Sequence, residues 1–162
     1  MHTGASGYAH AARELTAATE ELKAFVDTLE GVTLVGCPSL AIVPLQGEGG
    51  LNVYALATLL EKKGWGMFTG QKPASLGIPI GERTPKLLPQ LKKDLQEAVA
   101  MLREDPSIKP EGTAAVYGAA ASIPEQILED VLRGYVDVKL KVKPAVANGS
   151  GHVGNGHAKK AD

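Results

Sequence analysis

The chain has 162 residues, of which 44% are hydrophobic, and its formal net charge is −1. This length supports one domain with its own core, and a second full domain is not expected. The balanced charge argues against a surface for nucleic acid or anionic lipid, because both need a basic stripe. A lone cysteine, Cys37, excludes an intrachain disulfide and a thiolate metal cluster. The sequence has no apolar run of the roughly 20 residues needed to span a bilayer, so we expect a soluble chain.

Helix and strand patterns alternate along the first half of the chain. Apolar residues recur every three or four positions over residues 8–29, which predicts an amphipathic helix. Runs rich in β-branched residues at 32–35 and 40–45 predict two adjacent strands joined by a turn. Pro44 cannot donate to a strand ladder, so we place it near a strand end or on an edge.

A second helix and two further strands follow. Asn52 is expected to cap a helix over residues 53–63, whose apolar face consists of Val53, Leu56, Leu59 and Leu60. Strands are predicted at residues 65–68 and 75–80, with a loop over residues 70–73 between them. The sequence of elements so far is helix, two strands, helix, two strands.

The remaining segments are a long helix, a loop, a last helix and a tail. Thr84 followed by Pro85 predicts a helix start, and the helix continues to about residue 103. Ser122 and Glu125 have the spacing of a capping box for a helix that runs to about Tyr135. From residue 144 onward the composition of Gly, Asn, His, Ala and Lys predicts disorder.

This order of elements predicts an α+β fold, in which helices cover one face of a short, mostly antiparallel sheet. We therefore expect one domain over residues 1–143 and a disordered tail over residues 144–162.

The segment between the two last helices, residues 111–122, reads EGTAAVYGAAAS and is small, apolar and almost uncharged. We interpret it as a loop for close contact with another surface or a ligand, because Gly112 and Gly118 can adopt dihedrals closed to other residues. Tyr117 is the only aromatic side chain of this loop, and we expect it to be the one that stacks or forms a hydrogen bond.

Other candidate residues favour ordinary structural roles. The GEGG run at residues 47–50 lacks the Lys and Ser or Thr of a phosphate loop and is interpreted as a flexible loop. His152 and His157 lie on the tail, while His2 and His10 are isolated, so we expect no metal site. Cys37 is interpreted as a small apolar filler rather than a reactive thiol. Spacing alone gives no catalytic constellation.

Trp65 lies in the sequence KKGWG, where a helix is expected to meet a strand. We interpret it as a core anchor in preference to a stacking platform. Four lysines that alternate with acids on helix faces are interpreted as solvated: Lys62, Lys63, Lys92 and Lys93.

Short markers in a fixed order give the chain a resemblance to a known family, and the resemblance runs from the start to about Tyr135. The markers are Gly7 and Tyr8, Gly31 with the Val32 to Pro38 turn and the strand to Leu45, Asn52 to Tyr54, Lys63 to Trp65, Gln71 and Pro73, and Thr113 to Ala119. In this order they resemble the C-terminal part of sphingosine-1-phosphate lyases, which are pyridoxal-phosphate (PLP) enzymes of the group II decarboxylase superfamily.

The resemblance implies a retro-aldol cleavage of a phosphorylated long-chain base into a fatty aldehyde and phosphoethanolamine, with PLP as the electron sink. It also implies homodimers with sites near the subunit interface and, in eukaryotic relatives, a place at the endoplasmic reticulum membrane. The family's cofactor lysine follows a histidine in a preceding larger domain, and no lysine of this chain follows a histidine. We therefore expect an inactive fragment of such a lyase, whose partner is the missing cofactor domain.

Tyr117 resembles the family's substrate-side tyrosine, with Gly118 allowing close approach. The implied role of Tyr117 is a hydrogen bond to the substrate phosphate or hydroxyl, and the alternative is that it only packs its loop against the body. Gly77 stands where the family often has a histidine, and with Pro79 close behind we expect a less regular strand. The alternative function is a non-catalytic α+β binding or regulatory module.

Overall fold

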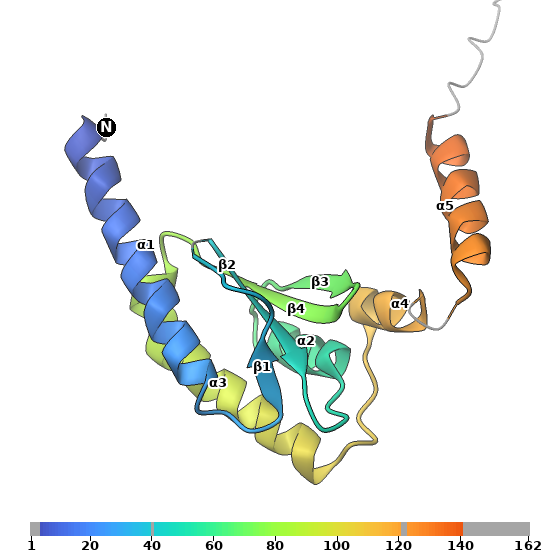
Figure 1. Ribbon diagram of the computed structural model, residues 1–162, viewed down its shortest axis with the longest axis horizontal. Coiled ribbons are helices and arrows are strands. Elements are labelled where there is room, and N and C mark those ends of the chain that lie inside the picture. The colour runs from blue at the N-terminus through green and yellow to red at the C-terminus, as the bar shows by residue number, and fades with distance from the viewer. Residues whose placement is uncertain (1–3, 40, 121–122, 141–162) are drawn as a thin grey trace, which may run out of the picture. The chain divides into compact units, whose positions relative to one another are not determined.

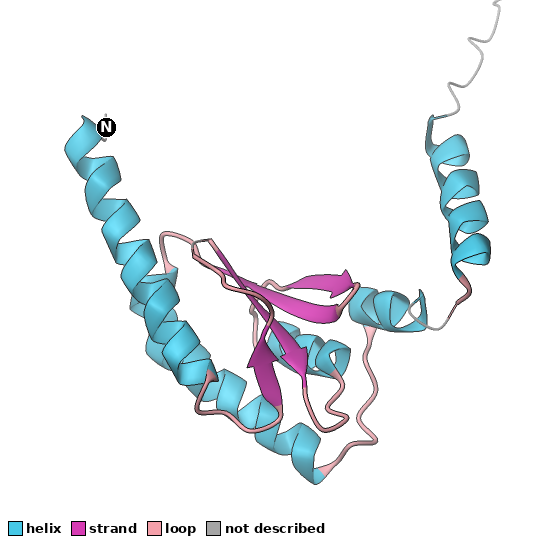
Figure 2. Ribbon diagram, in the orientation of Figure 1, coloured by secondary structure: helices cyan, strands magenta, loops and turns pink. Residues whose placement is uncertain are grey.

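The computed structural model describes residues 4–39, 41–120 and 123–140. These residues form five helices and four strands, which confirms the α+β class (Figures 1 and 2). The chain divides into two compact units, residues 1–124 and residues 125–162, and each unit is described by itself.

The first unit begins with α1 (Gly4–Val26), β1 (Val32–Leu34), β2 (Ile42–Gly47) and α2 (Val53–Lys62). It continues with β3 (Phe68–Gln71), β4 (Ala74–Pro79), α3 (Thr84–Glu104) and α4 (Gly112–Ala120). The second unit contributes α5 (Glu125–Leu140). The capping box at Ser122, the predicted tail at residues 144–162, and His2, His152 and His157 lie outside the described residues.

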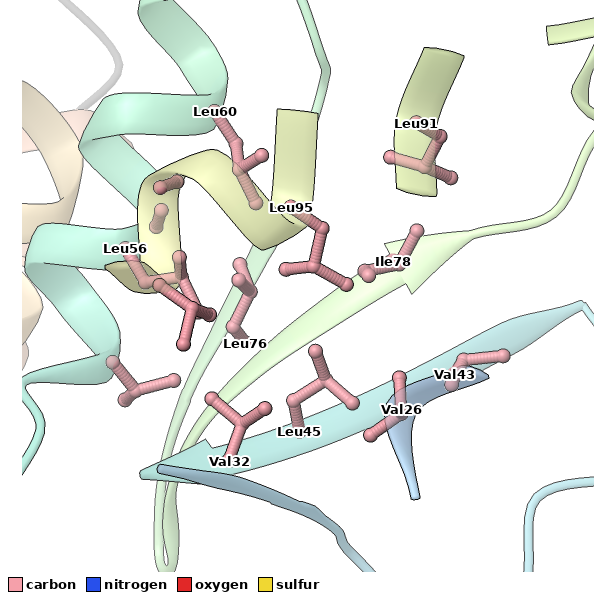
Figure 3. Packing of buried hydrophobic residues seen from close by; sticks show 14 of the residues in the cluster. Val26, Val32, Val43, Leu45, Leu56, Leu60, Leu76, Ile78, Leu91 and Leu95 are labelled. Atoms are coloured by element: carbon pink, nitrogen blue, oxygen red, sulfur yellow. The ribbon is translucent and has the colours of Figure 1, made fainter. Parts of the chain in front are cut away.

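The four strands form one sheet in the order β1-β2-β4-β3, and every neighbouring pair is antiparallel. This arrangement confirms the antiparallel sheet expected from the sequence. One face of the sheet carries the core. Its buried residues Val43, Leu45, Leu76 and Ile78 lie beside Leu56 and Leu60 of α2 and Leu91 and Leu95 of α3 (Figure 3).

The opposite face of the sheet carries a different set of residues, which we call the outer sheet face. The strand register places them together, because residues directly opposite each other in a ladder share a face. Ile42 and Phe68 are exposed there, by 44% and 57%. The apolar end of this face consists of Ile42, Pro44, Phe68, Gly77 and Pro79, and the same register adds Thr33, Gln46, Gly70 and Ser75 at its other end. The apolar end leaves two large side chains in water.

The expectation for Pro44 is wrong, since it lies in the middle of β2, an inner strand. Its carbonyl accepts a hydrogen bond from the Val35 N–H at 2.9 Å, so its nitrogen also faces the β1 side. β1 ends at Leu34, just short of this point. The N–H that Pro44 lacks would face Val35, which lies beyond the end of β1. No residue of β1 therefore loses a hydrogen bond.

The first strand of the second hairpin is shifted from its predicted position. The sequence predicts a strand at residues 65–68, whereas β3 covers Phe68–Gln71 and β4 starts at Ala74. The Trp65 N–H instead donates to the Leu60 carbonyl at 3.1 Å and continues the end of α2. The polar and glycine residues of β3 resemble a loop in sequence, and pairing with β4 makes them a strand.

The expectation of an irregular strand at Gly77 is also wrong. Gly77 pairs with Pro44 on one side and with Phe68 on the other. A Cβ atom at this position would lie 3.1 Å from Ile42 Cγ2 and 3.4 Å from Phe68 Cβ. Gly77 thus leaves room for the side chains of Ile42 and Phe68 beside a regular strand.

Candidate functional site: helix α4 and its contacts

The segment expected to be a contact loop is a helix, α4. Four of its nine residues are alanine, the residue with the highest helix propensity, and this outweighs the two glycines. Gly112 starts the helix with a φ of +56°, and Gly118 lies near its end. The small apolar composition was the right signal for close contact, but the wrong signal for a loop.

The first turn of α4 is fixed to α2 by polar contacts. The Glu111 N–H donates to Thr58 Oγ1 at 3.0 Å, and Lys62 Nζ donates to Glu111 Oε1 at 2.7 Å. Thr58 is itself buried and donates to the Tyr54 carbonyl at 3.1 Å. Ala114 is fully buried and adds an apolar contact to this junction. α4 therefore has a defined place on the first unit.

The last turn of α4 lies against the ring of Tyr54. A Cβ atom at Gly118 would be 3.3 Å from Tyr54 Cδ2 and 3.7 Å from Pro110 Cγ. A larger residue at this position would push the helix away from α2. The close approach expected at Gly118 is thus made to a side chain of the same unit.

Tyr54 is held from three sides. It is only 6% exposed, and its hydroxyl donates to the Gly70 carbonyl of β3 at 2.8 Å. Burial raises the pKa of its phenol above the ordinary value. The Asn52 side chain accepts from the Tyr54 and Ala55 N–H groups at 3.0 and 3.3 Å, which confirms the predicted cap. Tyr54 therefore links α2, β3 and α4.

Tyr117 lies one position before this contact and points to solvent over part of its surface, with 37% of it exposed. Val116 is 67% exposed beside it. Tyr117 is thus attached to a fixed helix and keeps part of its surface in water. Whether it contacts a substrate stays a prediction.

Lys63 is not the solvated lysine that the sequence predicts. Its Nζ lies 2.8 Å from Asp94 Oδ1 and 2.5 Å from Glu97 Oε2, which raises the pKa of the lysine. Asp94 is buried, and its other oxygen accepts from Trp65 Nε1 at 2.9 Å. The bonds from Lys63 and Trp65 lower the pKa of the Asp94 carboxyl. The interpretation of Trp65 as a core anchor agrees with this network.

Of the other three lysines, two make contacts between elements and one is solvated. Lys92 donates to Glu21 of α1 at 2.6 Å and lies 5.5 Å from the centre of the Phe25 ring, so it joins α1 to α3 and is not merely solvated. Lys62 holds Glu111, as described above. Lys93 is 67% exposed and fits the predicted solvated role.

Two further sequence interpretations need correction. Cys37 is exposed, so it is not an apolar filler of the core. His10 is not isolated from acids, since its Nε2 lies 3.5 Å from Glu14 on the surface of α1. Within residues 4–39, 41–120 and 123–140, no group of three or more His, Cys, Asp or Glu residues could hold a metal ion.

The GEGG run is partly strand and partly turn. Gly47 ends β2, and a Cβ atom there would lie only 2.0 Å from the Leu51 carbonyl oxygen. The run borders a surface hollow of about 460 Å³ whose charged residues are Glu30, Glu48 and Arg103. Arg103 is already paired with Glu30 at 2.6 Å, so the hollow offers no free cation for a phosphate.

A PLP site needs a lysine amine that is free to react. Lys63 is paired with two carboxylates, which raise its pKa. Lys63 therefore does not offer the free amine that a PLP site needs.

No helix in the described part of the chain is long and apolar enough to cross a membrane.

A comparison with protein-family models gives no match. Similar proteins are found among the curated sequences of several organisms. "Sphingosine-1-phosphate lyase 1" of Rattus norvegicus is 26% identical over 147 residues, covering 89% of this chain and 26% of the relative.

"Sphingosine-1-phosphate lyase" of Saccharomyces cerevisiae is 24% identical over 148 residues, covering 89% of this chain and 25% of the relative. "Probable sphingosine-1-phosphate lyase" of Legionella pneumophila is 28% identical over 137 residues, covering 82% of this chain and 22% of the relative. The chain thus spans about a quarter of the length of the curated relatives that it matches.

A solved structure has the same fold. The sphingosine-1-phosphate lyase of Burkholderia pseudomallei matches with a TM-score of 0.62 and 15% sequence identity, covering 86% of this chain and 27% of that chain. The resemblance stated from the sequence markers is confirmed by the curated relatives, and the solved structure shows the same fold. The chain is similar to sphingosine-1-phosphate lyases over about a quarter of their length.

Proposed function

We propose that this chain is the C-terminal small domain of a PLP-dependent lyase that cleaves phosphorylated sphingoid bases. The observation that carries the proposal is the extent of the similarity, because 89% of the chain aligns with lyases from organisms as different as rat and yeast. The fold of the first unit agrees with this assignment. The chain alone is inactive, and the cofactor domain supplies PLP and its lysine.

The outer sheet face is an argument for a large neighbouring domain, because it exposes apolar side chains. Ile42 and Phe68 would lose their contact with water if another domain covered them, and burial of apolar surface is the main favourable term in such contacts. Gly77 keeps the centre of this face flat. We assign this face to the cofactor domain of the same enzyme. A homodimer and a place at the endoplasmic reticulum membrane belong to the same proposal for the whole enzyme.

In this proposal Tyr117 binds the substrate. Its hydroxyl donates a hydrogen bond to the phosphate or the hydroxyl of the sphingoid base, and α4 gives that hydroxyl a fixed position. Gly118 contributes by bringing α4 close to Tyr54. Acid and base chemistry stays with the cofactor domain.

The test is a chimera of the rat lyase in which the stretch aligned with this chain is replaced by residues 1–162. We expect the chimera to release fatty aldehyde from a phosphorylated sphingoid base. The rat protein without that stretch and the purified 162-residue chain with added PLP should both be inactive. The isolated chain should also show no absorbance of a lysine–PLP adduct.

Two results would contradict the proposal. A stable lysine–PLP adduct on the isolated chain would mean that the chain is not a fragment that depends on another domain. A chimera that folds and binds PLP without turnover would favour the alternative, a non-catalytic α+β module.

A further inference from the structure

Helix α5 carries an apolar stripe that remains in water. Each member has another member three or four residues away, which places them on one side of a helix. Their exposed fractions lie between 54% and 71%, so the stripe has the composition of a buried face without the burial. The apolar stripe of α5 consists of Ile127, Val131, Leu132, Tyr135 and Val138.

The alignment with the lyases includes α5. A match over 89% of 162 residues leaves about 18 residues uncovered, so a continuous match contains all of residues 19–144 wherever those 18 lie. α5 covers Glu125–Leu140 and falls inside this range. The stripe therefore belongs to the part of the chain that is shared with proteins more than three times as long.

The polar side of α5 narrows the choice of partner. It carries the acids Glu129, Asp130 and Asp137, and Arg133 pairs with Glu129 at 2.6 Å. An acidic flank disfavours an anionic membrane surface, which attracts basic helices. Two copies of α5 paired along their stripes would bring these acidic flanks together. A partner with an apolar groove and a neutral or basic rim fits better.

We propose that the apolar stripe of α5 docks into an apolar groove of the lyase body, which is the part of a lyase-length polypeptide that this chain does not represent. The inference rests on the proposed function and deepens it, because it names the element that joins the second unit to the cofactor-bearing part. Docking would bury the five stripe residues and leave Glu129, Asp130 and Asp137 at the rim.

The first arm of the test uses the purified 162-residue chain. We expect a monomer by analytical ultracentrifugation, with fast hydrogen exchange at the α5 amides and slow exchange in the core strands. Protected α5 amides in a monomer would mean that the same chain already covers the stripe, and protected amides in a dimer would assign the stripe to a second copy. Either result overturns the proposal.

The second arm grafts residues 125–140 into the rat lyase in place of its aligned segment. Three grafts are compared: unchanged α5, Val131→Asp in the stripe, and Leu140→Asp as the matched control. Leu140 is 73% exposed and lies in line with Glu129 and Arg133 on the polar side, so the same substitution there meets water. The readout is the melting temperature of the lyase, so activity of the full chimera is a separate question.

We expect the unchanged graft to melt close to the parent enzyme. Val131→Asp should lower the melting temperature by several degrees, because an unpaired carboxylate enters an apolar groove, while Leu140→Asp should change it little. Equal melting temperatures for the two aspartate grafts would overturn the docking. An unchanged graft that destabilises the enzyme as much as Val131→Asp would overturn it as well.

Discussion

Helices α4 and α5 both follow α3 and are both rich in apolar residues, yet the structure treats them differently. α4 is short and carries small residues, and it packs closely on Tyr54 through Gly118. α5 is longer and carries large apolar residues, and these are more than half exposed along its stripe. A helix without a strong apolar stripe, such as α4, can thus pack closely on its own unit. An amphipathic pattern, as in α5, indicates only that another surface covers the helix.

The largest effect is expected from a pair of glycine substitutions that separates the two helices. Gly118→Val should lower the free energy of unfolding of the first unit by about 1–3 kcal/mol, because the new methyl groups meet the Tyr54 ring. Gly134→Val in α5 meets no atom within 4 Å and should raise helicity slightly. Urea unfolding, followed by Trp65 fluorescence, measures the stability of the first unit. Circular dichroism measures the change in helicity. Equal losses at both positions would show that α4 is no better placed than α5.

A second pair compares a buried acid with an exposed one. Asp94→Ala removes the acceptor for both Lys63 and Trp65, and we expect a loss of about 2 kcal/mol. Glu129→Ala removes a surface pair with Arg133 in α5, which is worth about 0.3–0.5 kcal/mol at most. Urea unfolding measures the first change and helicity of α5 the second.

The same carboxylate predicts how stability depends on pH. The folded state lowers the pKa of Asp94, so its contribution is present above the ordinary carboxyl pKa and is lost as pH falls through the lowered value. The difference in unfolding free energy between the wild type and Asp94→Asn should therefore shrink in acid. A difference that stays constant from neutral pH to below pH 3 would remove the ion pair from the account.

A smaller effect is expected from Tyr54→Phe. The substitution keeps the ring against Gly118 but takes the donor away from the Gly70 carbonyl, at an expected cost of about 1 kcal/mol. Tyr8→Phe, at a residue that is 72% exposed, is the matched control and should change nothing. If both variants unfold at the same urea concentration as the wild type, the link from α2 to β3 does not stabilise the fold.

Most of the first unit could be predicted from sequence because its elements carry local signals. The Asn52 cap, the Thr84 helix start and the antiparallel strand pairs agree with the structure. The buried side of α2 was predicted only in part. Tyr54 and Ala57 are buried as well, while Leu59 is half-buried, because α4 covers a second side of the helix.

The misses share one physical cause, which is that tertiary contacts decided between local alternatives. Glycine and alanine over residues 112–120 fit a loop or a helix, and the contact with Tyr54 favours the helix. Lysine beside acids resembles a solvated surface, and only the fold brings Lys63 to the buried Asp94. The first eight residues of α2 carry no charge, and that feature could have indicated a helix covered on two sides.

The central claim is that α4 presents Tyr117 to the substrate of a lyase, and the most direct measurement is the kinetics of Tyr117→Phe in the rat chimera, with Tyr8→Phe as the control. We predict that kcat/KM falls by roughly 10- to 100-fold, as expected for the loss of a hydrogen bond to a charged group, while PLP binding and melting temperature stay unchanged. Turnover and KM equal to those of the control would contradict the claim and leave Tyr117 as a surface residue of α4.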